Sequence, residues 1–583
     1  MTNQETEVTP KTRRPPRSRR RIWIFRTLAI AFPFLLIGLS EAILRTAGYG
    51  TDLSLVIQLT SLDRELPWQI NPRADRVYVG IGDVMGPQPR RIDIPPQKEI
   101  DRVVVIGGST VIGFPYAPEV AFPKYLQVLL NDVSPERPVE VLNLGITSIN
   151  SFAVADLVQQ SLQLNPDLII LHTGHNEFYG PGGPASTAQQ IPTSFAPSFY
   201  RWRRTRLSQL LTLTSKQQVQ DDLLSVLPST FQIPFESEMV SQATDNLISN
   251  LDTAITTASN AGIPVVLTTV ACNLRDQGPL NAFLPHDITE IEQNDWAIAM
   301  RDAEIAMLDD NYELSREKLN KAIEVCPEHA ASHYRLAQCL ERLNEPDAAL
   351  KEYELARDYD GCRFRAPSPF TKAIRDIAAS HPSVQFVDVV DELDAYTEFP
   401  APGFDLFLEH VHYNQQGHAA LARLLAPVVQ NARKLTWPTD HEITDDELVT
   451  QVGLVTEDEL AALSFSIQVL ESRPFQNTLD HQQHIQFLVN EILGKLDQLS
   501  PSRRECFESL NTDVMTNSLI ESLVKEHLRL GNLEDAHEMA QILLKRKPWK
   551  AESYQLAAQV AEARSDTQNG NDYADRAREL AVH

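Results

Sequence analysis

The sequence has little cysteine, and no cysteine pair spaced to bind a metal. Five cysteines are spread over 583 residues, and none belongs to a CxxC motif. An odd, scattered set predicts neither a disulfide framework nor a zinc site. It also does not indicate whether the protein lies in an oxidising or a reducing compartment. The five are Cys272, Cys326, Cys339, Cys362 and Cys506.

Basic residues are scarce outside the N-terminus. The formal net charge is −26, and the first 26 residues contain eight Lys/Arg and two Glu, so they carry +6 and the remainder carries −32. Nucleic-acid binding requires a cationic face, so this acidic body argues against a nucleic-acid partner. The share of hydrophobic residues, 43%, is ordinary for folded protein, and the length predicts two or three globular units.

Long apolar runs are absent apart from one, Ile22 to Leu44. It has the length that a membrane helix requires and follows a basic tail, residues 1–21, so we expect a transmembrane helix over 22–45. The run lacks a clean A-x-A cleavage site, which disfavours the rival interpretation as a signal peptide. Because arginines stay on the cytoplasmic side, the body of the protein is expected to be extracytoplasmic, either periplasmic or on the cell surface.

Residues 46–100 are rich in Pro, Gly and Arg, and they are interpreted as a stalk and a first β element. Within them Arg76–Val79 could form a short strand, and the pair Arg90-Arg91 is expected to be a solvated charged turn.

From Asp101 onward, predicted strands and helices alternate, which favours an α/β fold with a parallel sheet and helices on both faces. The predicted strands are Val103–Ile106, Val139–Leu144, Asp167–Leu171, Ile263–Val270 and Val384–Val389. The predicted helices are Lys124–Asn131, Ser151–Leu164, Asn246–Ala261, Thr371–Ser380 and Gly417–Leu425.

Residues that could perform catalysis follow several of these strands. A serine hydrolase needs a nucleophile, an imidazole base, a carboxylate that orients the base, and donors for the oxyanion. Ser109 could be the nucleophile, His412 the base and Glu409 the orienting acid. The amides of Ser109 and Gly145 and the side chain of Asn176 could stabilise the oxyanion. Each also has a structural interpretation: Ser109 as a helix cap, and Gly145 and Asn176 as turn residues.

Four blocks together resemble the SGNH (GDSL-type) hydrolase family. Residues 107–113, GGSTVIG, are similar to its G-D-S-x-x-x-G block, and Gly145 stands where the family has its second conserved glycine. Residues 174–177, GHNE, resemble G-x-N-D, and residues 409–412, EHVH, resemble D-x-x-H. The resemblance covers residues 101–283 and 363–435. It implies a flavodoxin-like fold and ester hydrolysis through a Ser-His-acid site.

Three positions depart from the family pattern, with Gly108, Glu177 and Glu409 replacing aspartate. Glu409 is one methylene longer but can still reach a ring nitrogen. Asp405 is the reserve candidate for the acid that orients His412.

Histidines also permit a metal interpretation, with HxxH at 172–175 and HxH at 410–412. Neither spacing is a recognised zinc arrangement, so packing or hydrogen bonding around the crevice is preferred for His172, His175 and His410. No metal and no cofactor are expected.

Helical segments interrupt and follow the hydrolase-like part. Residues 284–362 are predicted to be a helical insert that resembles tetratricopeptide repeats, because Leu336, Ala337, Leu340, Ala349, Tyr353 and Ala356 fall at the packing positions of that repeat. Residues 436–583 are expected to be helical with further repeats of this kind. Such repeats could offer a surface to a protein partner.

These observations predict a membrane-anchored serine esterase, or O-acyl transferase, acting on a small-molecule or glycan ester. The glycan is suggested by analogy with the family alone. Two alternatives remain open. One is a non-catalytic tetratricopeptide scaffold on an inactivated hydrolase fold, which would assemble a cell-envelope complex. The other is a soluble intracellular esterase.

Overall fold

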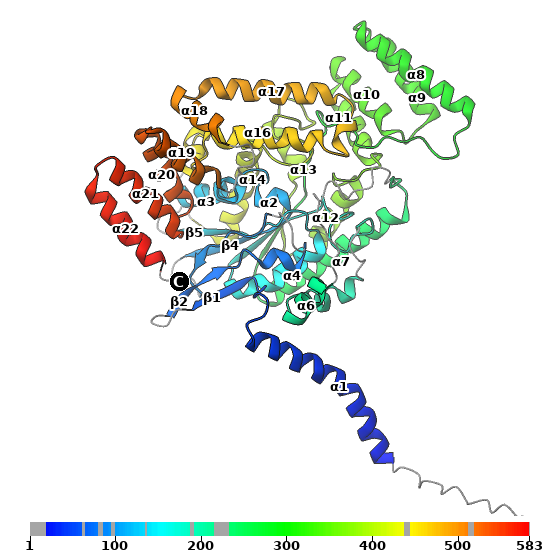
Figure 1. Cartoon of the computed structure of the whole chain (residues 1–583). Coiled ribbons are helices and arrows are strands. Elements are labelled where there is room, and N and C mark those ends of the chain that lie inside the picture. Colours follow the sequence, from blue (N-terminus) through cyan, green and yellow to red (C-terminus); the bar gives the residue numbers. More distant parts are fainter. Residues whose placement is uncertain are drawn as a thin grey trace, which may run out of the picture. The chain divides into compact units, whose positions relative to one another are not determined.

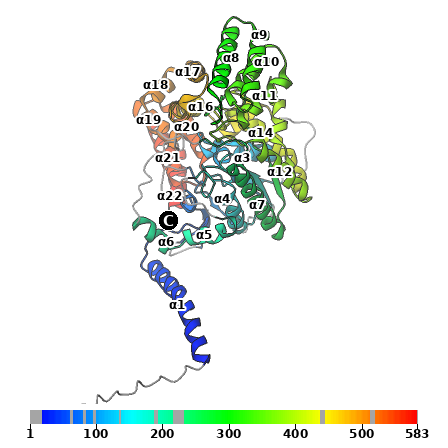
Figure 2. The same cartoon turned by 90° about the vertical axis from the view of Figure 1, so that its right-hand side faces the viewer.

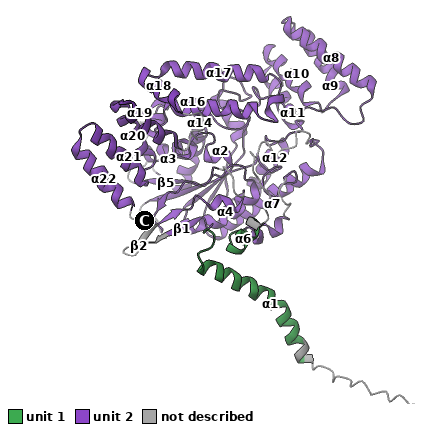
Figure 3. Ribbon diagram, in the orientation of Figure 1, with its two compact units in different colours: residues 1–52, 201–218 green, residues 53–200, 219–583 purple. Residues whose placement is uncertain are grey.

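The computed structural model describes residues 19–60, 65–79, 85–94, 100–133, 137–186, 192–214, 232–435, 443–510 and 518–581. It divides into two compact units, residues 1–52 with 201–218 and residues 53–200 with 219–583 (Figure 3). Most of the basic tail, residues 1–18, lies outside the described residues.

The smaller unit is built on helix α1 (Arg19–Thr46). Its segment Trp23–Thr46 is long and apolar enough to cross a membrane, with a mean hydropathy of 2.0 over its best window. Near its end, Glu41 pairs with Arg45 at 2.7 Å and accepts hydrogen bonds from the N–H groups of Arg206 and Leu207. Those two residues open helix α6 (Arg206–Thr214), so Glu41 satisfies N–H groups that have no partner within that helix.

The larger unit is a mixed α/β structure around a parallel sheet (Figure 1). The sheet is ordered β5-β4-β6-β7-β8, and every neighbouring pair is parallel. Its strands are β4 (Asp101–Gly107), β5 (Val139–Asn143), β6 (Leu168–His172), β7 (Val265–Thr268) and β8 (Gln385–Val387). The five predicted strands are therefore confirmed, although β4 extends beyond its predicted ends, β6 is shifted by one residue and the other three are shorter. Numbered along the chain from the first of them, their order in the sheet is 2-1-3-4-5.

Both faces of the sheet are covered. Val103 and Val105 pack with helices α3 (Phe122–Val133) and α14 (Gln415–Arg433). The alternate residues Val104 and Ile106 pack on the opposite face with three other helices. These are α4 (Ser151–Ser161), α7 (Glu238–Asn260) and α12 (Ser368–Ser380). Because both faces are covered, the strands are apolar throughout rather than alternating.

Residues 46–100 differ from the sequence-based interpretation. They contain an antiparallel sheet of β1 (Val56–Thr60), β2 (Glu65–Ile70) and β3 (Arg91–Ile92), and Ala74–Val77 is a 3-10 helix rather than part of a strand. The expected solvated turn is also wrong. Arg91 lies in β3, and Arg90 is half-buried and lies 3.1 Å from Glu140.

The predicted insert is a set of antiparallel helices. It comprises α8 (Glu290–Leu308), α9 (Tyr312–Val325), α10 (Ala330–Arg342) and α11 (Pro346–Asp358). Helices α10 and α11 lie side by side in both views (Figures 1 and 2). Ala337, Ala349 and Ala356 are buried where the helices meet, since small side chains allow close approach.

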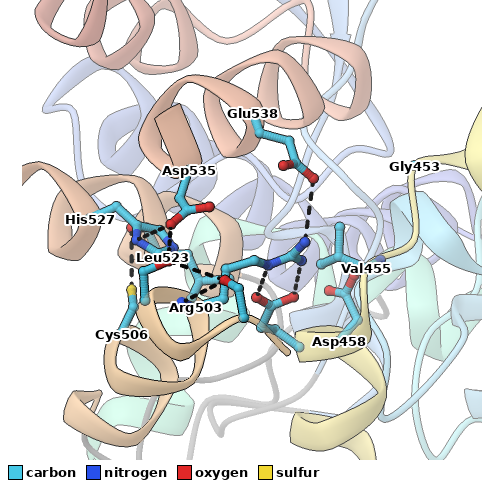
Figure 4. A network of polar contacts seen from close by, with 12 residues as sticks. Gly453, Val455, Asp458, Arg503, Cys506, Leu523, His527, Asp535 and Glu538 are labelled. Atoms are coloured by element: carbon cyan, nitrogen blue, oxygen red, sulfur yellow. Dashed lines mark hydrogen bonds and ion pairs between the residues drawn. The ribbon is translucent and has the colours of Figure 1, made fainter. Parts of the chain in front are cut away.

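The C-terminal region is helical, as expected. It contains α15 (Asp445–Val452), α16 (Thr456–Glu471), α17 (His481–Gln498), α18 (Pro501–Ser509), α19 (Leu519–Leu530), α20 (Leu533–Arg546), α21 (Ala551–Ala563) and α22 (Thr567–Ala581). Arg503 binds Glu457 through two nitrogens and lies 3.4 Å from Glu538, so one guanidinium joins α16, α18 and α20 (Figure 4).

Candidate active site

Ser109 stands directly beyond strand β4, as the first residue of the short helix α2 (Ser109–Ile112). The turn before it is tight, because a Cβ built on Gly107 would lie 2.0 Å from the carbonyl oxygen of His172. Only glycine fits at that point. A residue in the first turn of a helix has no intrahelical acceptor for its N–H, so the amide of Ser109 can bind a ligand.

His412 meets Ser109 from a distant part of the chain. Its Nε2 lies 2.8 Å from Ser109 Oγ, although 303 residues separate the two in sequence. His412 belongs to a loop that closes on itself, where Phe407 pairs with Tyr413 and the N–H of Leu408 donates to the carbonyl of His412 at 2.8 Å. The geometry allows the imidazole to take the hydroxyl proton of Ser109.

Glu409 contacts the other ring nitrogen of His412. One carboxylate oxygen pairs with His412 Nδ1, and the second pairs with His410 Nδ1 and accepts the N–H of His410 at 2.5 Å. Burial raises the pKa of this carboxyl, but the two imidazoles outweigh burial and hold the pKa below its usual range. Glu409 is therefore an ionised, 1% exposed carboxylate that orients two histidines.

Asp405, the reserve acid, has other partners. Its Oδ1 accepts the N–H of Gly403 at 2.7 Å, and its Oδ2 lies 3.5 Å from Arg275. The structure therefore brings Glu409, rather than Asp405, to His412.

The two further oxyanion candidates lie close to helix α2 and the turn before it. A Cβ on Gly145 would lie 2.3 Å from the backbone nitrogen of Ile112, and one on Gly108 would lie 3.1 Å from Asn176 Nδ2. Asn176 Nδ2 donates one hydrogen bond, to the carbonyl of Ile149 at 3.0 Å, and keeps a second N–H. The N–H of Gly145, in contrast, already donates to Asn143 Oδ1 at 2.9 Å. Asn176 is thus the better placed of the two to add an oxyanion donor to the amide of Ser109.

The remaining histidines are engaged by the protein. His175 Nε2 lies 3.1 Å from the carbonyl of Ala271, and its Nδ1 accepts the N–H of Ala366 at 3.2 Å. His172 Nδ1 lies 2.7 Å from Thr268 Oγ1, and burial lowers the pKa of His172 to about 3. Both histidines are therefore neutral packing residues at the ends of the central strands.

One group among the described residues has donor atoms near enough to share a metal ion, namely Glu409, His410 and His412, with ligand atoms within 4.8 Å of one another. The same atoms contact each other directly through the carboxylate. This arrangement, with Ser109 on the far ring nitrogen of His412, matches a Ser-His-acid site.

Aromatic residues around His412 were not anticipated from the sequence. Phe114 packs against His412 with ring centroids 4.8 Å apart, and Phe465 of helix α16 packs against Phe114 at 5.1 Å. Phe475 packs against His410 at 4.7 Å. No spacing rule links Phe465 or Phe475 to the histidine block, because the contact exists only after folding.

No protein-family model and no curated protein matches this chain.

Proposed function

We propose that this protein is a membrane-anchored serine ester hydrolase of the SGNH type, acting on an acyl ester outside the cytoplasm. The observation that carries the proposal is the continuous contact from Ser109 through His412 to the buried Glu409. The strand order 2-1-3-4-5 supports a flavodoxin-like core, in which ligands bind beyond the carboxyl ends of the strands. Ser109 stands at such an end.

In the proposed mechanism, Ser109 Oγ attacks the ester carbonyl as His412 Nε2 accepts its proton. The amide of Ser109 and the side chain of Asn176 bind the oxyanion. Glu409 stabilises the imidazolium, which then protonates the leaving alcohol. Water attacks the acyl-enzyme to release the acid, or a sugar hydroxyl attacks it to give a new ester.

Location and accessory helices complete the proposal. The apolar segment of α1 serves as the anchor, and the arginines that precede it stay on the cytoplasmic side. The antiparallel pairs α8–α9 and α10–α11 support tetratricopeptide-like packing. Susceptibility of residues 53–581 to protease added to intact cells tests the orientation, since cytoplasmic domains would be protected.

Labelling with a fluorophosphonate probe tests the catalytic assignment. Wild type should be labelled, and Ser109→Ala should not be. The matched control is Ser380→Ala, since Ser380 ends helix α12 and its hydroxyl donates only to the carbonyl of Ile377 at 2.8 Å. A folded wild type that neither reacts with the probe nor hydrolyses short acyl esters contradicts the proposal.

A further inference from the structure

A groove runs beside strand β5, which is an edge strand of the large sheet. Side chains already occupy the outer backbone groups of Val141: its carbonyl accepts from Arg90 Nη1 at 3.2 Å, and its N–H donates to Gln127 Oε1 at 3.1 Å. A protein strand is therefore not expected to pair here. Two cavities of about 430 and 160 Å³ lie along this edge, and both are lined by Arg90, Pro548 and Trp549.

The lining of the two cavities is basic, in a chain whose net charge is −26. Seven basic residues line them, against three acidic ones, Asp93, Glu119 and Glu140. The basic residues are Arg90, Arg91, Arg102, Lys124, Lys545, Arg546 and Arg576. The groove is thus positively charged although the chain as a whole is negative, and a positively charged groove attracts anions.

Some of these cations already have their own carboxylates. Arg102 binds Glu140 at 2.7 Å, Arg546 pairs with the buried Asp458, and Arg576 lies 2.7 Å from Glu579. These pairs stabilise the walls of the groove rather than offer charge to a ligand.

Two other cations make no ion pair with a carboxylate among the described residues, although the charge of Glu552 acts on Arg91 and that of Glu119 on Lys124. Arg91 donates to the carbonyl of Leu580, and burial together with the charge of Arg576 lowers its pKa. The side-chain ammonium of Lys124 has neither an ion pair nor a hydrogen bond within the described chain, and burial, Arg90 and Lys545 lower its pKa to about 8 against the opposing charge of Glu119. Each of these two cations has another cation nearby and no carboxylate in contact with it, and a bound oxyanion would relieve the repulsion.

Trp549 stands where the two cavities meet, and the guanidinium of Arg90 lies 5.7 Å from the centroid of its ring. An indole beside guanidinium groups suits a ligand that has an extended apolar face as well as negative charge. Two neighbouring cavities that share three lining residues also fit a chain of units better than a single small ion. A sugar chain bearing carboxylates has an apolar ring face, negative charge and repeated units.

One lining residue of the smaller cavity contacts helix α2, which begins at Ser109. Asn143, the last residue of β5, lines it, and its side chain accepts the N–H of Gly145 and donates to the carbonyl of Val111 in helix α2. From Glu140 in the larger cavity to Asn143 is three residues of extended chain, about 10 Å. The groove therefore leads toward the helix that carries Ser109.

We propose that the groove along β5, bounded by Arg91, Lys124 and Trp549, binds an acidic oligosaccharide. The groove would then hold a part of the substrate that lies away from the ester, and this assignment rests on the proposed function. The negative units occupy the positions beside Arg91 and Lys124, and the face of a sugar ring packs against Trp549.

Binding can be measured without turnover on the full-length Ser109→Ala protein in detergent micelles. Oligogalacturonate, a carboxylated glycan, should bind, and its affinity should fall as salt is raised. A neutral malto-oligosaccharide of equal length should not bind. Arg91→Gln and Lys124→Gln should each weaken oligogalacturonate binding about tenfold, the usual effect of losing one charge-assisted hydrogen bond.

The matched control is Lys372→Gln, which removes an exposed lysine of α12 that pairs with Asp376 and should leave binding unchanged. Thermal unfolding of each variant shows whether it is folded. Absence of oligogalacturonate binding by the folded protein, or unchanged affinity in the Arg91→Gln/Lys124→Gln double variant, overturns the proposal. Equally tight binding of inorganic phosphate, without dependence on glycan length, overturns the assignment to a glycan, as does binding of anionic lipid vesicles alone.

The two proposals can fail separately. If wild type is not labelled by fluorophosphonate but the groove variants lose oligogalacturonate, the groove is a glycan-binding site and its substrate role is wrong. If labelling requires Ser109 and oligogalacturonate does not bind, the hydrolase assignment stands and the groove proposal is wrong.

Discussion

The two halves of the candidate active site are held in different ways. Ser109 follows strand β4, whose residues Val103–Ile106 are fully buried and paired with β5 on one side and β6 on the other. His412 lies in a loop and not after a paired strand. That loop is held by the hydrogen bond to Ser109, by the N–H of Asn273 donating to the carbonyl of His410 at 2.9 Å, and by Phe407 and Tyr413, which pack in the same core cluster as Val103 and Val105 of the sheet. The serine is therefore positioned by strand pairing, whereas the histidine is positioned by the packing and hydrogen bonds of its loop.

Further contacts to this loop come from the two helical regions outside the hydrolase-like part. Val411 belongs to the same apolar cluster as Tyr334 and Ala337 of the insert. From the C-terminal region, Phe465 reaches His412 through Phe114, and Phe475 packs on His410. The added helices thus contribute to holding the histidine half of the site, which no paired strand carries.

Changing the acid of the histidine half should have the largest effect. Glu409→Gln should lower kcat for a short acyl ester about 10³- to 10⁴-fold, because the amide cannot stabilise the imidazolium of His412. The measurement is the initial rate of ester hydrolysis. Asp405→Asn is the matched control and should cost less than about tenfold, since Asp405 contacts Gly403 and Arg275 instead. Equal losses in both variants would contradict the role of Glu409.

A buried carboxylate beside the oxyanion candidate Asn176 should make stability depend on pH. Glu177 accepts hydrogen bonds from the N–H and the Oγ–H of Ser151 at 2.9 and 2.6 Å. These bonds lower the pKa of Glu177, but burial outweighs them and raises the pKa to about 7. Between about pH 4.5 and 7 the folded state then holds more protons than the unfolded state. The free energy of unfolding therefore falls as pH rises, by up to about 3 kcal/mol from this group, and levels above pH 7.

Glu177→Gln should remove this fall in the free energy of unfolding between pH 4.5 and 7, because glutamine does not titrate. Denaturant unfolding of both proteins at pH 4.5, 5.5, 6.5 and 7.5 gives the difference. Parallel pH profiles for wild type and variant would show that Glu177 does not titrate in this range.

The second histidine on Glu409 should have a smaller effect. His410→Phe removes the imidazole that contacts the second oxygen of Glu409, so the carboxylate can shift away from His412, and kcat should fall about tenfold. His410→Asn supplies an amide donor and should recover part of the rate. If phenylalanine and asparagine have the same effect, the contact to Glu409 is not what His410 contributes.

The support from the insert should be the smallest contribution. Tyr334 donates to the carbonyl of Arg275 at 2.8 Å, next to the cluster that contains Val411, whereas Tyr353 donates to Glu341 at 2.9 Å within the insert. Tyr334→Phe and Tyr353→Phe should each lower stability by about 1 kcal/mol. Only Tyr334→Phe should also reduce kcat, by roughly two- to fivefold. A similar loss of rate in Tyr353→Phe would mean that the insert does not act through Tyr334.

The sheet was predictable because its strands are short apolar runs that end at turn residues, and every one of the five lies close to its predicted place. A β element was expected within residues 46–100, but the positions of β1 to β3 were not predicted, because these strands mix polar and apolar residues and β3 is two residues long. Arg90 and Arg91 suggested a solvated turn because the sequence does not show which distant residues a pair of arginines will contact. The cavity that they line forms only when β3, β5 and the C-terminal helices come together.

By itself, the sequence determined the apolar N-terminal helix, the alternation of strands and helices, and the candidate residues at the strand ends. Each depends on local pattern: an apolar run, a glycine pair, or a carboxylate three residues before a histidine. Only the tertiary structure decided that Glu409 rather than Asp405 meets His412, that the N–H of Gly145 is taken by Asn143, and that a basic groove lies in an acidic chain. These features depend on which distant segments become neighbours, and chain folding, rather than residue spacing, sets those distances.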